Sequence, residues 1–311
     1  MIPPAPTIAV HEIDATQSMD LARFLAPRWT DVPYSASVDV GLVRREILAT
    51  PPPSIYAVRW QQHRQFAAYR AGQMIGFLDA AVGLDADSDH IPDYQPHGLI
   101  RFLALPERGA LVSNTARALL AAVQNFWRAA GVGFVQAFHL TTGYPSFQAG
   151  AGILPGDWGD HVRTLTEAGF LLRDRYYCYV RRLTEPVEEV TPLANLGLVF
   201  RGDWNNRRYE IYYRRIERVA WGRMVRMTLP IDNEPFPVAK LVELFVDPQW
   251  RHKDIGKWLL RRMINDATHL GDTQLIAHLA QQRHAAINLL IQQGFNELSY
   301  RGYSLEKALT E

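Results

Sequence analysis

The chain has 311 residues, of which 48% are hydrophobic and 21% charged, a composition of folded globular proteins that suits about two domains. Its formal net charge of +1 gives no overall attraction to nucleic acid or to an anionic membrane. The sequence has no apolar run long enough to span a bilayer and no secretory signal, so we expect a cytoplasmic protein without a membrane partner.

The first half of the chain alternates strands and helices. Apolar runs and turn residues predict strands at 8–13, 64–70, 74–82, 99–105, 134–140 and 170–183. Helical periodicity and end signals predict helices at 16–25, 38–48, 110–130 and 161–168. The acidic, proline-bearing segment 184–192 then predicts an interdomain linker.

The second half repeats this order. Strands are predicted at 198–201, 207–213, 219–229, 241–246, 274–279 and 295–305, and helices at 255–270 and 284–293. The segment LIRFLALP, which ends at Pro106, matches LVELFVDP, which ends at Pro248, and Gly169-Phe170 matches Gly294-Phe295. Whole supersecondary units are repeated, which indicates two duplicated domains at 1–184 and 191–311. Between its first strand and its hairpin, the first copy has two helices and the second only residues 202–206.

One turn in the second copy is suited to hold a phosphate. The strand Leu241–Val246 ends at Asp247 and Pro248, and the basic turn Arg251–Gly256, called here the phosphate cradle, then opens a helix. Free N–H groups at a helix N-terminus, flanked by Arg and Lys, attract an anion. The alternative is an ordinary connection from strand to helix with a solvated basic turn.

The order of elements resembles the GNAT (GCN5-related N-acetyltransferase) superfamily, in two tandem copies. In that family a strand ending in Val-x-Pro precedes a glycine-containing basic turn, which is similar to Val246-Asp247-Pro248 and the phosphate cradle here. The resemblance implies an α/β fold with a mixed sheet in each domain, in which the second copy lacks the helices after its first strand. It also implies acetyl-CoA or another acyl-CoA as cosubstrate, with no metal. The first copy has no matching basic turn after Pro106 and is read as degenerate.

The same resemblance implies which residues bind the coenzyme. Asp254 stands where the family motif has its first glycine, and Leu290 stands where the family has a tyrosine that often acts as general acid. The residues implied to contact the coenzyme are Phe245, Val246, Arg251, His252, Lys253, Asp254, Ile255, Gly256, Lys257 and Arg283.

The chemistry of amine acylation also needs a base and an acid. Glu243 is the only carboxylate in the strand before the phosphate cradle and is the first candidate base. Tyr300 and Tyr303 on the last strand are candidates to replace the missing acid. Glu243 could equally face solvent or pair with an arginine, both tyrosines could be ordinary strand residues, and His278 is read as structural.

A second feature is the segment 201–226, which contains eight arginines interleaved with aromatic residues. Such spacing suits single-stranded nucleic acid or a polyanion. The alternatives are a hairpin with one solvated arginine face and one aromatic core face, or a surface where the two halves dock. Cys178, the only cysteine, lies in an apolar run and is predicted to be a buried strand residue.

The sequence therefore predicts an N-acyltransferase that moves an acyl group from acetyl-CoA to a primary amine. One alternative is a weakly active or inactive CoA-binding or scaffold protein, favoured by Asp254 and Leu290. Another is a tandem enzyme that resembles aminoacyl or peptidyl transferases, favoured by the arginine-rich segment. The expected partner is a small-molecule or peptide amine; nucleic acid is disfavoured, and the protein is expected to be a monomer or homodimer.

Overall fold

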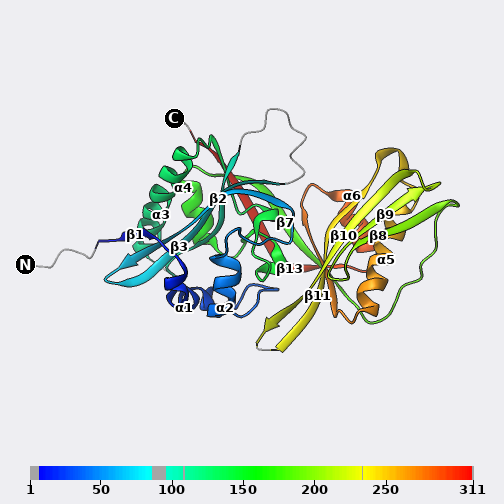
Figure 1. The fold of residues 1–311 in the computed structure, drawn as a ribbon, viewed down its shortest axis with the longest axis horizontal. Helices are drawn as coiled ribbons and strands as arrows, with labels where there is room; N and C mark the ends of the chain where they lie inside the picture. The colour runs from blue at the N-terminus through cyan, green and yellow to red at the C-terminus, as the bar shows by residue number, and fades with distance from the viewer. Residues whose placement is uncertain (1–6, 86–95, 108, 233, 310–311) are drawn as a thin grey trace, which may run out of the picture. The chain divides into compact units, whose positions relative to one another are not determined.

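The computed structural model describes residues 7–85, 96–107, 109–232 and 234–309. The chain forms two compact units (Figure 1). The first unit comprises Met1–Arg175 and Arg301–Glu311, and the second comprises Tyr176–Tyr300. The strands of each unit pair in a mixed parallel and antiparallel arrangement, which agrees with the predicted α/β class and with the predicted duplication.

The sheet of the first unit has one parallel strand pair, β4 with β5, and its other neighbouring strands are antiparallel. The short strand β6 (Leu154–Pro155) pairs with β13 beside this path. In spatial order the strands are β1 (Ala9–Glu12), β2 (Val58–Arg70), β3 (Gln73–Asp85), β4 (His97–Ala104), β5 (Phe134–Ala137) and the end of β13 (Asn296–Ala308).

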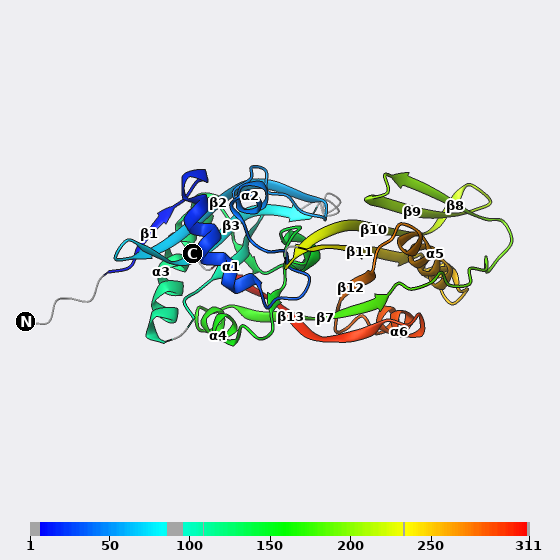
Figure 2. The ribbon, with the colours of Figure 1, turned by 90° about the horizontal axis from the view of Figure 1, so that it is seen from below.

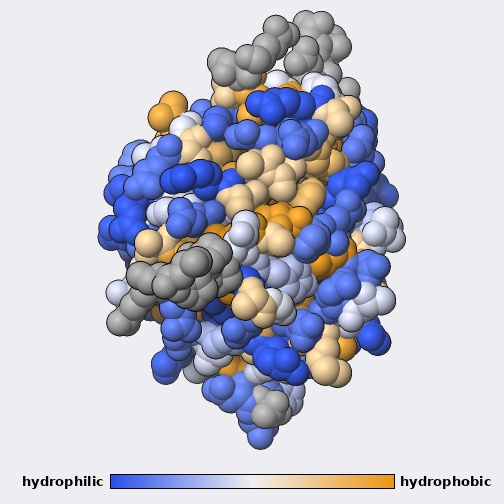
Figure 3. All heavy atoms as spheres, turned by 90° about the vertical axis from the view of Figure 1, so that its left-hand side faces the viewer, coloured by the Kyte–Doolittle hydropathy of each residue, from blue (hydrophilic) through white to orange (hydrophobic). Residues whose placement is uncertain are grey.

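Helices cover both faces of this sheet. Figures 1 and 2 show α1 and α3 on opposite faces. The helices of this unit are α1 (Ser18–Trp29), α2 (Val40–Leu42) with its π-helical continuation Val43–Ile47, α3 (Ala110–Ala129) and α4 (Gly159–Glu167). On the side of this unit that carries β1, Figure 3 shows a band of apolar side chains across a mostly hydrophilic surface.

The sheet of the second unit follows the same plan, with β11 and β12 as its parallel pair. Its strands in spatial order are β8 (Leu196–Gly202), β9 (Asn206–Tyr213), β10 (Glu217–Ile231), β11 (Glu234–Val246), β12 (Gln274–Ala280) and β7 (Leu171–Arg182). The strand predicted at 241–246 begins seven residues earlier, at Glu234. Pro235 and Pro237 hide this start, because prolines argue against a strand in sequence-based reasoning.

Helices cover only one face of this second sheet. Helix α5 (Ile255–His269) and helix α6 (His284–Gln292) share a core with Tyr209, Leu241 and Leu275. Within the described residues 176–232 and 234–300 the other face carries no helix of this unit. This agrees with the prediction that the second copy lacks the two helices that follow the first strand in the first copy.

The two units exchange their last strands. Strand β7 follows helix α4 of the first unit, but its residues Tyr176–Arg182 pair with β12 in the second. Strand β13 follows α6 of the second unit, but its residues Leu305–Ala308 pair with β5 in the first. The compact units therefore differ from the predicted domains 1–184 and 191–311. Both copies end in the same Gly-Phe-strand pattern, so the sequence carries no sign of the exchange.

The predicted linker 184–192 also has a different role, because it belongs to the second unit and lies along α5. The Val187 N–H donates a hydrogen bond to Asn265 Oδ1 at 2.7 Å. The Trp258 indole N–H donates to Glu189 Oε1 at 3.0 Å. The chain instead passes between the units inside β7 and inside β13.

Candidate functional site

The parallel strands of the second unit separate at a β-bulge. Strands β11 and β12 pair only between Val238–Leu241 and Gln274–Ala277. The bulge at Val242 then shifts the register of β11 against β10. Because β11 continues to Val246 without pairing to β12 there, backbone groups on that edge are available to a ligand.

Helix α5 begins close to the end of this edge. Its first internal hydrogen bond runs from the Trp258 N–H to the Asp254 carbonyl at 2.9 Å. The N–H groups of residues 255–257 have no earlier helical carbonyl to bond, so they point out of the helix N-terminus. At Gly256 a Cβ atom would lie 3.3 Å from Val246 Cγ2, so glycine lets this first turn sit tightly against β11.

Asp254 adopts a left-handed backbone conformation, with φ of 56° and ψ of 9°. Glycine adopts this conformation without cost, which gives a physical reason for the glycine of the motif. Aspartate is among the residues that tolerate it, at a cost of roughly 1 kcal/mol. Its side chain is exposed and makes no capping hydrogen bond, so the Asp254 carboxylate remains as a negative charge at the helix N-terminus.

Two cationic side chains are held beside this helix start. Arg251 Nε donates to the Val246 carbonyl at 3.2 Å, which folds the arginine back onto the end of β11. Lys253 Nζ lies 4.4 Å from the centroid of the Trp250 ring. The Trp250 indole N–H in turn donates to Glu217 Oε1 at 2.8 Å. The phosphate cradle thus combines free N–H groups with two positioned cations.

The remaining predicted coenzyme residues are arranged around this point. Phe245 stacks on Trp221 with ring centroids 4.1 Å apart. Lys257 lies in the first turn of α5, and Arg283 is the exposed residue before α6. The structure brings the cradle and the end of β11 together, and it places Arg283 at the start of the neighbouring helix.

The predicted catalytic residues are not brought together in one unit. Glu243 is half-buried on β11 directly after the bulge, opposite Arg223 on β10. Tyr300 belongs to the second unit, whereas Tyr303 belongs to the first. There the centroid of the Tyr303 ring lies 5.7 Å from Arg175 Cζ. Leu290 is only 2% exposed and packs in the core of the second unit, so that position supplies no acid.

Sequence reasoning noted Cys178 and His278 as structural residues but missed Lys240, which forms a buried polar cluster with them on the second sheet. Lys240 on β11 lies beside Ile276, and His278 faces Cys178, which the strand register places on the same face. Burial lowers the pKa of Lys240 to about 7, and burial together with Lys240 lowers the pKa of His278. Burial raises the pKa of Cys178 to about 12, so it is no thiolate nucleophile. The sequence signal that could have revealed this cluster is Lys240 itself, a lysine inside the apolar run of β11.

The corresponding place in the first unit is filled by its own side chains. Strands β4 and β5 pair only over Gly98–Ile100 with Val135–Ala137, and a bulge follows at Arg101. Arg101 is fully buried and donates to Asp79 Oδ2 and to the Thr142 carbonyl, each at 3.0 Å. His63 and Tyr144 bond to the same Asp79 carboxylate. The network occupies the space beside the bulge.

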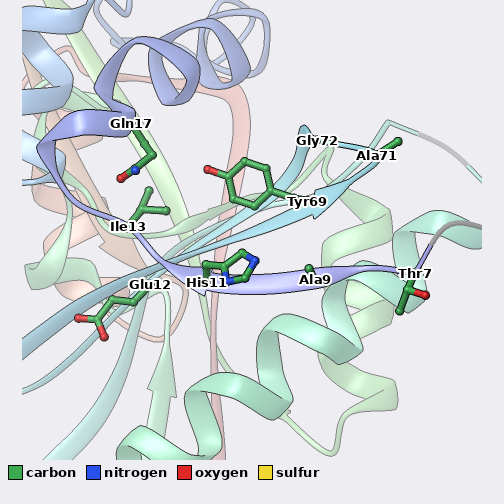
Figure 4. Close-up of a pocket in the computed structure, with 9 residues that line it drawn as sticks. All are labelled: Thr7, Ala9, His11, Glu12, Ile13, Gln17, Tyr69, Ala71 and Gly72. Atoms are coloured by element: carbon green, nitrogen blue, oxygen red, sulfur yellow. The ribbon is translucent and has the colours of Figure 1, made fainter.

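A shallow pocket of about 440 Å³ lies elsewhere in the first unit, between β1 and the turn that joins β2 to β3 (Figure 4). Figure 4 shows Glu12 pointing away from His11 and Tyr69. Because these groups do not converge, we assign no ligand to this pocket.

Within the described part of the chain, no cluster of three His, Cys, Asp or Glu side chains is arranged to hold a metal ion. In the same residues, no helix has the length and apolar character needed to cross a bilayer.

Comparison with known protein families gives one match, and the matched residues include the phosphate cradle. Residues 197–295 match the acetyltransferase (GNAT) family. No curated protein matches the chain.

Solved structures match over almost the whole chain. A tandem GNAT protein from the clavulanic acid biosynthesis pathway, described without AcCoA, is 14% identical with a TM-score of 0.66, covering 98% of this chain and 99% of that one. A GCN5-related N-acetyltransferase from Sphaerobacter thermophilus is 10% identical with a TM-score of 0.62, covering 97% and 95%. A GCN5-related glucosamine N-acetyltransferase region of a fungal multi-domain GH3 beta-N-acetylglucosaminidase is 12% identical with a TM-score of 0.71, covering 98% and 38%. At these identities the likeness concerns the fold.

Proposed function

Because this chain belongs to the GNAT superfamily as a member with two tandem GNAT-like domains, we propose that its second unit is an acyl-CoA-dependent N-acyltransferase for a primary amine. The observation that carries this proposal is the N-terminus of α5. Its free N–H groups, with Arg251 and Lys253 beside them, lie at the end of the unpaired edge of β11. This arrangement suits a pyrophosphate at the helix and an extended thioester arm along the strand edge.

The residues of β11 supply the chemistry of the transfer. A backbone N–H after the bulge at Val242 would donate to the thioester oxygen and stabilise the oxyanion of the tetrahedral intermediate. Glu243 would accept, directly or through water, the proton that the amine loses as the new N–C bond forms and the C–S bond breaks. Acetyl-CoA is the acyl donor that the family match favours.

One alternative is a GNAT-fold protein that binds coenzyme without efficient turnover. Leu290 favours it, because this position in the core of the second unit offers no proton to a leaving thiolate. Asp254 favours it as well, since a carboxylate at the helix N-terminus repels an anion.

Binding is tested by thermal denaturation of the full chain with and without acetyl-CoA. Saturation at about one hundred times Kd should stabilise the protein by about 2.7 kcal/mol. The double variant Arg251→Ala, Lys253→Ala should abolish the shift. Arg214→Ala with Arg215→Ala is the matched control, because these exposed arginines lie in the β9–β10 turn. No shift for the unaltered protein would refute the coenzyme site.

A turnover assay distinguishes the N-acyltransferase from the coenzyme-binding protein. Acetylation of an amine panel that is lost in Glu243→Gln, with coenzyme binding retained, supports the transferase. Coenzyme binding without acetylation of any amine supports the binding protein.

A further inference from the structure

The sheet face of the second unit that carries no helix of its own presents arginines. Strand register places Arg201 on β8, Arg208 on β9, and Arg218 and Arg223 on β10 on the same face of the sheet. We call these four residues the arginine face. The side chains of Arg201, Arg208 and Arg218 are 63%, 41% and 41% exposed. Six of the eight arginines of the segment therefore separate by face, since Arg207 and Arg226 lie on the helix-covered side and pair with Asp266 and Asp272. The other two, Arg214 and Arg215, lie in the β9–β10 turn.

A single carboxylate organises three of these arginines. The Glu210 side chain is 5% exposed, and Arg201, Arg208 and Arg218 approach it at 2.8, 3.3 and 3.5 Å. Burial alone would raise the pKa of Glu210, but hydrogen bonds from Arg201 and Tyr212 hold it below its usual value. Glu210 is therefore charged and neutralises one of three guanidinium groups, so the arginine face keeps an excess of positive charge.

An aromatic surface adjoins these cations. Trp221 lies on the arginine face, directly opposite Glu210, so the predicted division into an arginine face and an aromatic face is wrong for this residue. Its ring stacks on Phe245, and Arg218 Cζ lies 4.6 Å from the Trp221 ring. Flat apolar rings beside guanidinium groups can bind a molecule that has both an apolar part and an anionic part.

This surface continues to the proposed reaction centre. Phe245 faces Trp221 and Glu243 faces Arg223 across the β10–β11 pair, directly after the bulge. Helix α5 and the phosphate cradle lie against the opposite face. Since neighbouring strands are about 4.8 Å apart, Arg223 on β10 lies roughly 5 Å, and Arg208 on β9 roughly 10 Å, from Glu243 across the sheet.

We propose that the arginine face binds the acceptor, and that this acceptor is an amine carrying an anionic group, a carboxylate or phosphate, within roughly 10 Å of its nitrogen. The anionic group contacts Arg208, Arg218 and Arg223, the apolar part lies on Trp221 and Phe245, and the amine points to Glu243. This inference rests on the proposed transferase function and specifies its substrate class.

The arrangement favours a small anionic amine over single-stranded nucleic acid. Strand-tracking surfaces need successive aromatic platforms along a continuous cationic groove. Here Trp221 and Phe245 stack on each other and form a single platform.

The test is equilibrium binding of product-like peptides to the full chain by isothermal titration. The carboxylate probe is N-acetyl-phenylalanyl-glutamate, and N-acetyl-phenylalanyl-glutaminamide is its neutral match. N-acetyl-phenylalanyl-phosphoserinamide tests the phosphate. We expect an anionic probe to bind about tenfold to a hundredfold more tightly than the neutral one, the range for hydrogen bonds to charged groups. The stronger of the two anionic probes identifies the group.

The variants Arg218→Gln and Arg223→Gln should remove most of this preference and leave neutral-probe binding unchanged, which also shows that the variants are folded. Arg215→Gln is the matched control in the same hairpin and should keep the preference. Acetyl-CoA binding is measured in parallel and should be unaffected, so loss of coenzyme binding identifies failure of the proposed function and not of this inference.

Equal binding of anionic and neutral probes, or no binding of any probe at millimolar concentration, overturns the inference. Binding of a single-stranded oligonucleotide that falls steeply with salt and is lost in Arg218→Gln also overturns it, in favour of nucleic acid.

Discussion

In the first unit the bulge after the parallel strand pair carries Arg101, whereas in the second unit it carries Val242. Arg101 is buried and bonds to Asp79, so side chains fill the space beside the bulge. Val242 is half-buried, and the strand edge that follows it has no β12 partner. The same backbone feature thus serves as a structural anchor in one copy and as an open edge in the other.

The turns that lead from β4 to α3 and from β11 to α5 also differ between the two units. Helix α3 begins six residues after the end of β4, at Ala110, and its N-cap residue Gly109 makes no side-chain hydrogen bond. Helix α5 begins nine residues after the end of β11, at Ile255, behind a turn that contains Arg251 and Lys253. The two folds thus share the same plan, and in the second unit the longer turn places two cations, Arg251 and Lys253, beside the helix start.

The largest expected effect concerns the exchanged strands. A fragment of residues 1–184 lacks Leu305–Ala308, the segment that pairs with β5. We expect it to show no cooperative thermal transition by circular dichroism. A synthetic peptide of residues 296–309 added in trans should restore the transition, and a scrambled peptide should not. A cooperative transition of the fragment alone would contradict the exchange.

The next effect compares the two bulge residues. Arg101→Ala leaves the Asp79 carboxylate buried without its arginine and should destabilise the protein by about 3–5 kcal/mol in urea denaturation. Val242→Ala removes a half-buried side chain and should cost about 1 kcal/mol or less. Similar losses for both variants would show that the two bulges do not differ as described.

A third prediction concerns the buried lysine of the second sheet. The pKa of Lys240 is about 7 in the folded protein and 10.5 as its reference value, so between these values the unfolded chain binds more protons. Stability should therefore rise from pH 7 to pH 9, by up to about 1.4 kcal/mol per unit, with no further loss from Lys240 below pH 7.

Urea denaturation at pH 7, 8 and 9 measures this slope, and Lys240→Met should flatten it. The window stays at or below pH 9 because the raised pKa of Cys178 makes stability fall above that value. An unchanged slope in Lys240→Met would assign the pH dependence to other groups.

The smallest expected effect is a change in the affinity of the phosphate cradle for acetyl-CoA. Asp254→Gly removes both a left-handed aspartate and a negative charge at the helix N-terminus, so acetyl-CoA should bind up to about tenfold more tightly. Asp232→Gly is the control, because Asp232 also has a positive φ, of 50°, but lies in the β10–β11 turn. Both variants should gain stability, and an affinity gain in both would exclude an electrostatic role for Asp254.

The sequence allowed the repeat, the order of elements and the cradle to be predicted, because each depends on local patterns such as apolar periodicity and Gly-Phe turns. It did not reveal that Trp221 shares a face with the arginines, since this depends on a bulge at Val219 and on the register of β10. It also grouped Tyr303 with Tyr300, although the unit boundary falls between them. Register and strand partnership are long-range properties that local propensity does not encode.

The strand exchange also sets the order in which the protein can be completed during synthesis. Ala137 emerges from the ribosome long before Leu305, its partner in the sheet. At 5–20 residues per second the delay between them is roughly 10–30 seconds. During that time one edge of β5 is exposed and open to wrong pairing. Slower translation should lengthen this exposure, so yield of soluble protein in cells should depend on elongation speed and on chaperones as well as on the stability of the finished fold.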